Sequence, residues 1–180
     1  MCTICSLTIE FSVEHPLALA VAVATRQAID EGLLPGAAVD GMDMQQSRHH
    51  AITLLTSMQQ RLEQVLSPSR LMALPTFYVL MIESRTWGYF QPTRSGFDQQ
   101  ANPSPPRLEP DENGDRDSVL VISQAAAKEL TSGRLPFEAA ERADLLYLDA
   151  PSHTVGAIGL AFTKTYPMGE FSSFVCTEVA

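Results

Sequence analysis

Three cysteines and one histidine are the residues whose types could support metal or thiol chemistry. Cys2 and Cys5 form a C-x-x-C pair, a spacing at which two thiols chelate zinc or cycle as a redox disulfide. A structural zinc site needs further ligands, which His15 and Cys176 would supply if folding brought them to the pair. A redox pair is expected at a helix start after a buried strand, a context that this pair lacks. The pattern favours cysteines without a shared function over a metal or a redox site, and no cofactor is predicted.

Motifs that carry catalytic chemistry are absent from the rest of the sequence. It contains no phosphate-binding loop, dinucleotide fingerprint, nucleophile elbow or zinc-protease motif. His49 and His50 are adjacent at a predicted helix start and point to different faces, so they do not form a chelating pair. Because catalytic groups converge in space rather than in sequence, this absence lowers the expectation of an enzyme without excluding one. We therefore predict no catalytic residue and favour a non-catalytic protein.

An aromatic cluster follows the most apolar run of the chain. Phe77–Ile82 is continuously apolar and rich in β-forming residues, which predicts a buried central strand with a hairpin partner at 87–91. Aromatic side chains of that partner can line a pocket for an apolar ligand, although such side chains more often fill cores. The predicted pocket residues are Trp87, Tyr89, Phe90 and Tyr147.

Composition limits the partners. The chain has 180 residues, enough for one domain with a core of normal size, and a net charge of −9. An acidic surface repels phosphates, so we predict no nucleic-acid partner. The longest apolar segment, Pro16–Thr25, is too short to span a membrane and lacks the basic flank of a signal peptide. These features, with an odd number of cysteines, predict a cytoplasmic protein without a disulfide framework.

Two helices are expected in the first part of the chain. Residues 16–31 begin with Pro16, end before Gly32 and are apolar almost all round, which indicates a helix that is buried or covered by a partner. This helix is the predicted contact of a homo-oligomer or of a docked protein. Residues Arg48–Leu66 follow the i, i+3, i+4, i+7 rule of an amphipathic helix, with Ser47 as its N-cap.

A single domain, 1–180, is predicted, with a helical N-terminal extension, 1–47, and an insert, 92–116. The insert is acidic, rich in proline and poor in apolar side chains, so it is expected to be a flexible surface loop. Its segment Pro103-Ser104-Pro105-Pro106 is either a polyproline II patch for a partner or, as we favour, a plain linker.

The clearest local pattern lies at 117–149. An apolar β-type run, Ser118–Ile122, leads to a capping residue, Ser123, and to a helix that ends in a Gly-Arg-Leu-Pro break. A short second helix and a second β-type run, Leu145–Leu148, follow. Later segments are less clear, because 154–162 fits either a helix or a strand and 172–176 predicts only a weak last strand.

This pattern resembles the SCP2-like (sterol carrier protein 2) family, which has a strand, a helix ending in a Gly-Lys-Leu-like turn, a short helix with a central alanine and a strand. The matching residues are Val119–Ser123, Ser132-Gly133-Arg134-Leu135, Ala140 and Leu145–Leu148. Asp144 and Ala150 depart from the family, which often has glycine there. The resemblance carries no catalytic residue over and implies an α+β fold around a hydrophobic tunnel for lipids or acyl chains.

The order of the expected elements predicts an α+β fold, with helices packed on one face of a small, mainly antiparallel sheet. The first functional hypothesis is a non-catalytic protein whose apolar pocket binds a lipid or other hydrophobic small molecule. The alternatives are a protein-interaction or dimerisation module using helix 16–31, and a thiol or metal protein built on Cys2 and Cys5.

Overall fold

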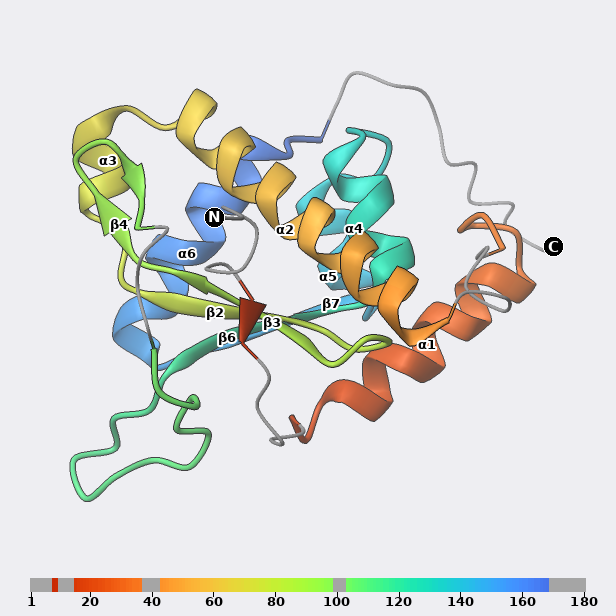
Figure 1. Cartoon of the computed structure of the whole chain (residues 1–180), viewed down its shortest axis with the longest axis horizontal. Coiled ribbons are helices and arrows are strands. Elements are labelled where there is room, and N and C mark those ends of the chain that lie inside the picture. The colour runs from red at the N-terminus through yellow and green to blue at the C-terminus, as the bar shows by residue number, and fades with distance from the viewer. Residues whose placement is uncertain (1–7, 10–14, 37–42, 99–102, 169–180) are drawn as a thin grey trace, which may run out of the picture.

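The computed structural model describes residues 8–9, 15–36, 43–98 and 103–168 (Figure 1). A five-stranded sheet has the order β1-β3-β2-β6-β7, and two short strands, β4 and β5, form a separate hairpin. The strands are β1 (Thr8–Ile9), β2 (Phe77–Met81), β3 (Thr86–Phe90), β4 (Pro92–Thr93), β5 (Gly96–Phe97), β6 (Ser118–Ile122) and β7 (Leu146–Asp149). The helices are α1 (Ala18–Asp30), α2 (Met44–Val65), α3 (Pro68–Met72), α4 (Gln124–Thr131), α5 (Phe137–Arg142) and α6 (Ser152–Thr165).

The sheet joins the two halves of the chain. β2 and β3 form the predicted hairpin, and Tyr78 faces Tyr89 in its register. β2 also pairs with β6, in parallel, while β6 pairs with β7 and β3 with β1 in antiparallel fashion. Because β2 and β6 are fully buried central strands, they carry continuous apolar runs rather than alternating ones. The prediction of an α+β fold with a mainly antiparallel sheet is confirmed.

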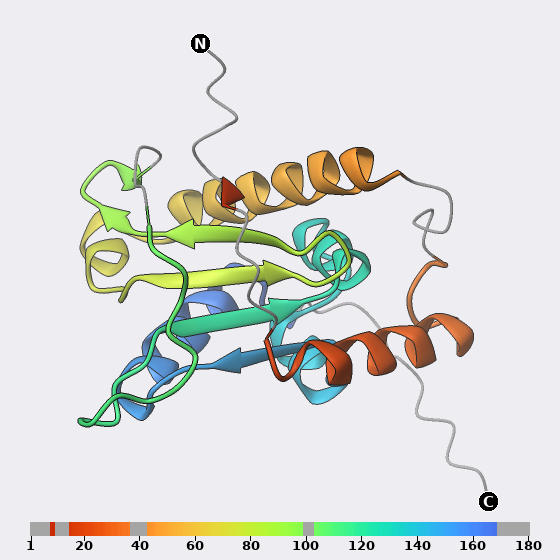
Figure 2. The ribbon, with the colours of Figure 1, turned by 60° about the horizontal axis from the view of Figure 1, so that its bottom comes forward.

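One face of the sheet carries the main core. Helices α2 to α6 cover this face, and Figure 2 shows α2 running alongside β3. α2 lies close to the sheet because Gly88 has no side chain, so that Leu55 fills the space a Cβ would take. The largest fully buried side chains here include Phe77, Phe90, Phe137, Phe162, Leu55, Met58 and Leu62.

The second face is covered by α1. Val21 of this helix is fully buried against a smaller cluster that contains Trp87 and Val121. Leu108, from the loop before β6, packs against the same cluster. Because β1 pairs with β3 and α1 covers this face, residues of the predicted extension 1–47 contribute to the sheet and its packing.

The start of α2 differs from the prediction. The helix begins at Met44, and the side chain of Asp43 caps it by accepting a hydrogen bond from the backbone N–H of Gln46 at 2.7 Å. Ser47, predicted as the cap, is buried inside the helix, where its Oγ accepts a hydrogen bond from the side-chain amide of Gln124 at 3.0 Å. Both residues suit an N-cap by type, and tertiary contacts decide between them.

The unit 117–149 folds as its pattern predicts. Ser123 caps α4 by accepting a hydrogen bond from the N–H of Ala126 at 3.1 Å, and Gly133 has the positive φ of 77° that ends the helix. The carboxylate of Glu83 also accepts from the N–H of Gln124, at 2.8 and 2.9 Å. Burial raises the pKa of Glu83 more than these hydrogen bonds lower it. Residues 154–162, left open between helix and strand, lie in α6.

The insert 92–116 is not one continuous loop. Its first residues form the β4–β5 hairpin, and Phe97 is buried against Phe77 and Phe90 at centroid distances of 6.4 and 5.2 Å. The isolated Phe97 in a polar sequence gives no periodic signal, so its role in the core could not be predicted. The weak strand predicted at 172–176 lies outside the described residues.

Candidate functional site

A hollow of about 470 Å³ lies on the second face of the sheet, beneath the loop 103–117. Its floor is the tyrosine pair on β2 and β3, whose ring centroids are 5.0 Å apart. The loop supplies its wall. We call it the tyrosine hollow and define it by Tyr78, Tyr89, Pro103, Ser104, Pro105, Arg107 and Asp117.

The hydroxyl of Tyr78 joins the floor of the hollow to its wall. It donates a hydrogen bond to the backbone carbonyl of Ser104 at 2.9 Å. Burial, with a smaller contribution from the nearby carboxylate of Asp117, raises the pKa of Tyr78 to about 12. The hydroxyl therefore stays protonated at neutral pH and can act as a hydrogen-bond donor. Burial also raises the pKa of Tyr89.

The loop that forms the wall is held at its base. The N–H of Arg107 donates to the carboxylate of Asp117 at 2.7 Å, and the N–H of Asp117 donates to the carbonyl of Arg107 at 3.0 Å. At the tip, Asp111 accepts from the N–H groups of Asn113 and Asp115, each at 2.9 Å. These local bonds order a polar segment that has few apolar side chains to bury.

The predicted pocket residues do not line one pocket. Trp87 and Phe90 are both fully buried, but they belong to the clusters on opposite faces of the sheet. Tyr89 lines the tyrosine hollow, whereas the hydroxyl of Tyr147, on β7, donates to Asp144 at 2.7 Å. Strand alternation places neighbours on opposite faces, and this signal separates Trp87 and Tyr89 from Phe90.

Sequence reasoning missed Tyr78, Arg107 and Asp117. Within the apolar run 77–82 the period of two places Tyr78 on the face opposite Phe77, and a polar tip in a buried strand is a detectable signal. The loop residues gave no such signal, because only the tertiary fold brings the loop over the sheet.

A second polar cluster joins α1 to β7. His15 is buried, and its Nε2 donates to Asp149 Oδ2 at 3.1 Å. Arg116 donates from Nη1 to Asp149 Oδ2 at 2.7 Å and makes a second contact with Oδ1. The N–H of Leu17 donates to His15 Nδ1 at 3.2 Å. In a neutral imidazole both ring nitrogens are thus engaged, so the ring has no free nitrogen to act as a base on a substrate. We call His15, Arg116 and Asp149 the tether, because they hold the start of α1 to β7.

The tether predicts a pH-dependent stability. Burial lowers the pKa of His15 from 6.5, and this outweighs Asp149, which raises it, while Arg116 lowers it further. As the pH falls through 6.5 the unfolded chain takes up a proton that the folded protein resists, so the free energy of unfolding falls until the folded pKa is reached.

We expect His15→Gln, which keeps an N–H donor without titrating, to reduce this loss. The loss is measured by urea unfolding between about pH 7.5 and pH 5, at no more than about 1.4 kcal/mol per pH unit for one proton. His50→Gln is measured in parallel, because burial also lowers the pKa of His50 and this histidine adds to the loss with the same sign. Each variant should remove only its own part of the loss. An identical pH profile for His15→Gln and wild type would contradict the prediction.

The candidate metal ligands are only partly described. His15 lies in the tether, while Cys2, Cys5 and Cys176 lie outside the described residues. In the described ranges, no group of three or more His, Cys, Asp and Glu side chains is arranged to hold a metal ion. Within these same ranges, no helix has the length and apolar character needed to cross a membrane.

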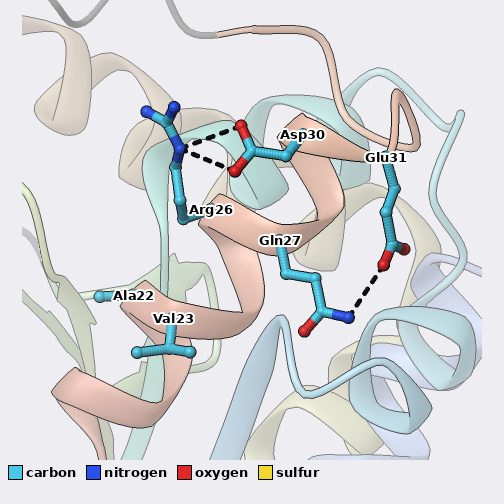
Figure 3. A pocket seen from close by; sticks show the side chains of 6 residues that line it. All are labelled: Ala22, Val23, Arg26, Gln27, Asp30 and Glu31. Atoms are coloured by element: carbon cyan, nitrogen blue, oxygen red, sulfur yellow. Dashed lines mark hydrogen bonds and ion pairs between the residues drawn. The ribbon is translucent and has the colours of Figure 1, made fainter.

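The exposed surface of α1 forms a shallow shelf (Figure 3). The six residues that border it, Ala22, Val23, Arg26, Gln27, Asp30 and Glu31, all come from α1 and its C-cap. Arg26 pairs with Asp30 at 3.1 Å, and Gln27 donates to Glu31 at 2.9 Å. Towards the N-terminus of the helix, Leu19 and Val23 are 74% and 60% exposed. The shelf is a surface of one helix and not a cleft between elements.

Comparison of the chain with protein-family models, with curated proteins and with solved structures gives no match. The function therefore has to be inferred from the site itself.

Proposed function

We propose that the protein is a non-catalytic binding module and that the tyrosine hollow is its ligand site. The observation that carries the proposal is the tyrosine pair itself. Tyr89 is only partly buried, and the Tyr78 hydroxyl, a permanent donor at neutral pH, is bonded to a backbone carbonyl at the edge of a hollow of about 470 Å³. Partly covered aromatic faces with a few fixed polar groups are the usual components of a binding pocket.

The charged groups of the hollow support binding rather than catalysis. Asp117 is engaged by the backbone N–H of Arg107, so its carboxylate is committed to holding the loop. The high pKa of Tyr78 makes its hydroxyl a poor general base at neutral pH. What the hollow offers a ligand is the partly exposed ring of Tyr89 and, once the Ser104 carbonyl has moved away, the hydroxyl donor of Tyr78.

We expect small aromatic probes to bind in the hollow and to lose their site when Tyr89 is removed. Phenol, indole and benzamide would be titrated into ¹⁵N-labelled protein, and the shifted amides should cluster at the residues of the tyrosine hollow. Tyr89→Ala should weaken the affinity for each probe about fivefold or more, because base-sized rings gain about 1–3 kcal/mol by stacking on an aromatic side chain.

Tyr147→Ala is the matched control. This tyrosine belongs to the pocket predicted from sequence but lies outside the hollow, with its hydroxyl bonded to Asp144. The control should leave the shifts unchanged. Probe binding that responds to Tyr147→Ala and not to Tyr89→Ala would contradict the proposed site, as would the absence of any shift in the hollow.

A lipid or other hydrophobic small molecule is the ligand class that the SCP2-like resemblance supports. A lipid-binding form of the proposal needs an apolar tunnel. Trp87 and Phe90 are fully buried and would have to move out of the core to line it. Native mass spectrometry of the purified protein tests it through co-purified lipid. Protein that carries none and takes up no fluorescent fatty acid would exclude this form.

A second candidate function, self-association through α1, is favoured by the exposure of Leu19 and Val23. The occupant we propose is a second copy of the chain. On the shelf, the charges of Arg26 and Asp30 offset each other in an ion pair. Two copies that meet there therefore repel each other less than the net charge of −9 of the whole chain implies.

Val23→Asp should shift a dimer to a monomer in sedimentation equilibrium. Leu160→Asp is the matched control, because Leu160 is a 57% exposed apolar residue on α6 and should leave the mass unchanged. A wild-type protein that is monomeric at high concentration would exclude self-association.

A further inference from the structure

We propose that the tyrosine pair of this hollow binds a proline-rich peptide in the polyproline II conformation once the wall segment 103–106 has moved off it, and that this segment is an internal occupant of the tyrosine pair that competes with the peptide. The inference rests on the proposed function and names the ligand class of the same site. It gives a role to the segment Pro103-Ser104-Pro105-Pro106, which composition alone assigns to a linker.

The internal contact supplies the chemistry. Pro103 and Pro105 border the hollow beside the tyrosine pair, and the carbonyl between them, that of Ser104, accepts the Tyr78 hydroxyl at 2.9 Å. A polyproline II helix has no internal hydrogen bonds, so its carbonyls are free to accept from a partner. Proteins that recognise such helices dock them in aromatic-lined grooves. The protein thus places its own proline segment on the kind of surface that recognises one.

The polar groups of the hollow select for the same ligand. The Tyr78 hydroxyl stays a donor, whereas the Asp117 carboxylate already accepts the Arg107 N–H. A matching ligand is rich in acceptors and poor in donors. A prolyl chain fits this requirement, because each proline offers a carbonyl and lacks an N–H. A ligand without acceptors would not replace the Ser104 carbonyl as the acceptor of the Tyr78 hydroxyl, at a cost in affinity.

Competition follows from the covalent link. An occupant tethered in the same chain competes at an effective concentration far above that of a free peptide. The apparent affinity for an external peptide is then the intrinsic affinity multiplied by the fraction of molecules in which the internal segment has left the site. Weakening the internal segment should strengthen binding in trans. A simple structural loop would not have this effect.

The test uses the full chain and an acetylated decaproline peptide, with a glycine-serine peptide of equal length as the control. Binding is followed by amide shifts and by the fluorescence of Trp87, the single tryptophan, whose ring lies 6.2 Å from that of Tyr78. The released variant is Pro103→Ala with Pro105→Ala. We expect it to bind decaproline about tenfold more tightly than wild type, because removing an internal competitor raises the competent fraction.

Two further changes, each made in the released variant, locate the site. Tyr78→Phe keeps the ring and should weaken decaproline about fivefold through the lost donor, and Tyr89→Ala should weaken it more than tenfold. Glu138→Gln, an exposed change on α5, should have no effect. Should Tyr89→Ala fail to fold, as judged by circular dichroism, Tyr78→Phe alone decides.

Each outcome bears on the inference. Tighter binding to the released variant, lost through Tyr78 and Tyr89, supports it. Equal affinity for wild type and the released variant overturns the internal competition. Equal binding of decaproline and the glycine-serine peptide overturns the ligand class. If the aromatic probes shift the hollow and decaproline does not, the inference fails while the proposed function stands. If neither binds, both fail.

Discussion

Replacing Gly88 with alanine is expected to lower the free energy of unfolding by about 1–3 kcal/mol, the usual cost of overpacking a core. A Cβ at this position would lie 2.7 Å from Leu55 Cδ2 and 3.1 Å from Phe90 Cε2. Both neighbours are fully buried, so neither can move into solvent. The measurement is urea unfolding followed by circular dichroism.

A double-mutant cycle separates this clash from other effects. Leu55→Ala alone should cost about 2–5 kcal/mol, because it leaves a cavity under α2. The alanine Cβ at position 88 partly fills that cavity. The double variant should therefore lose about 1 kcal/mol less unfolding free energy than the two single losses added together. Additive effects would contradict the close approach of α2 to β3.

Gly156→Ala is the matched control for the same chemical change. Gly156 lies in α6, and an added Cβ there meets no atom within 4 Å. Alanine has a higher helix propensity than glycine, so this variant should be more stable than wild type by about 0.5–1 kcal/mol. The two substitutions thus predict opposite signs.

Asp149→Ala is the second change with a large expected effect. The carboxylate, 19% exposed, accepts from both His15 and Arg116, and its removal leaves these two donors without their acceptor. Breaking a buried pair from one side costs about 3–5 kcal/mol, and the partial exposure here reduces the expectation to about 2–3 kcal/mol. The tether holds the start of α1, so the loss should also appear as faster hydrogen exchange in that helix.

Asp30→Ala provides the comparison, because it removes another aspartate–arginine pair from the same protein. The side chains of Arg26 and Asp30 are 69% and 57% exposed, and such pairs contribute about 0.5 kcal/mol or less. A loss for Asp149→Ala no greater than that for Asp30→Ala would show that the tether does not stabilise the fold.

Several local features followed from sequence alone. The continuous apolar run of Phe77–Ile82 predicted the buried central strand β2, the apolar run of Ser118–Ile122 predicted the strand β6, and the period of 3.6 residues predicted the amphipathic helix α2. Ser123 was found as a cap because its type and its position after a strand agree. These features depend only on residues close together in the chain, so the residue types and their spacing are enough to predict them.

The site depended on contacts between distant segments. Nothing local pairs Tyr78 with the carbonyl of Ser104, 26 residues away, or His15 with Asp149, 134 residues away. The choice of Asp43 over Ser47 as a cap was also made by a distant partner, Gln124. Residue types were correctly recognised as aromatic or titratable, but their partners were not.

The sequence by itself therefore determined the strands β2, β3, β6 and β7, the helices α1, α2, α4 and α5, the α+β class and the acidic, motif-poor character of the protein. Only the tertiary structure decided which helix or loop covers each face of the sheet and which polar groups meet. The physical reason is that apolar periodicity and capping are encoded within one turn or strand. A hollow arises only where a loop, held by its own hydrogen bonds, is laid across a sheet.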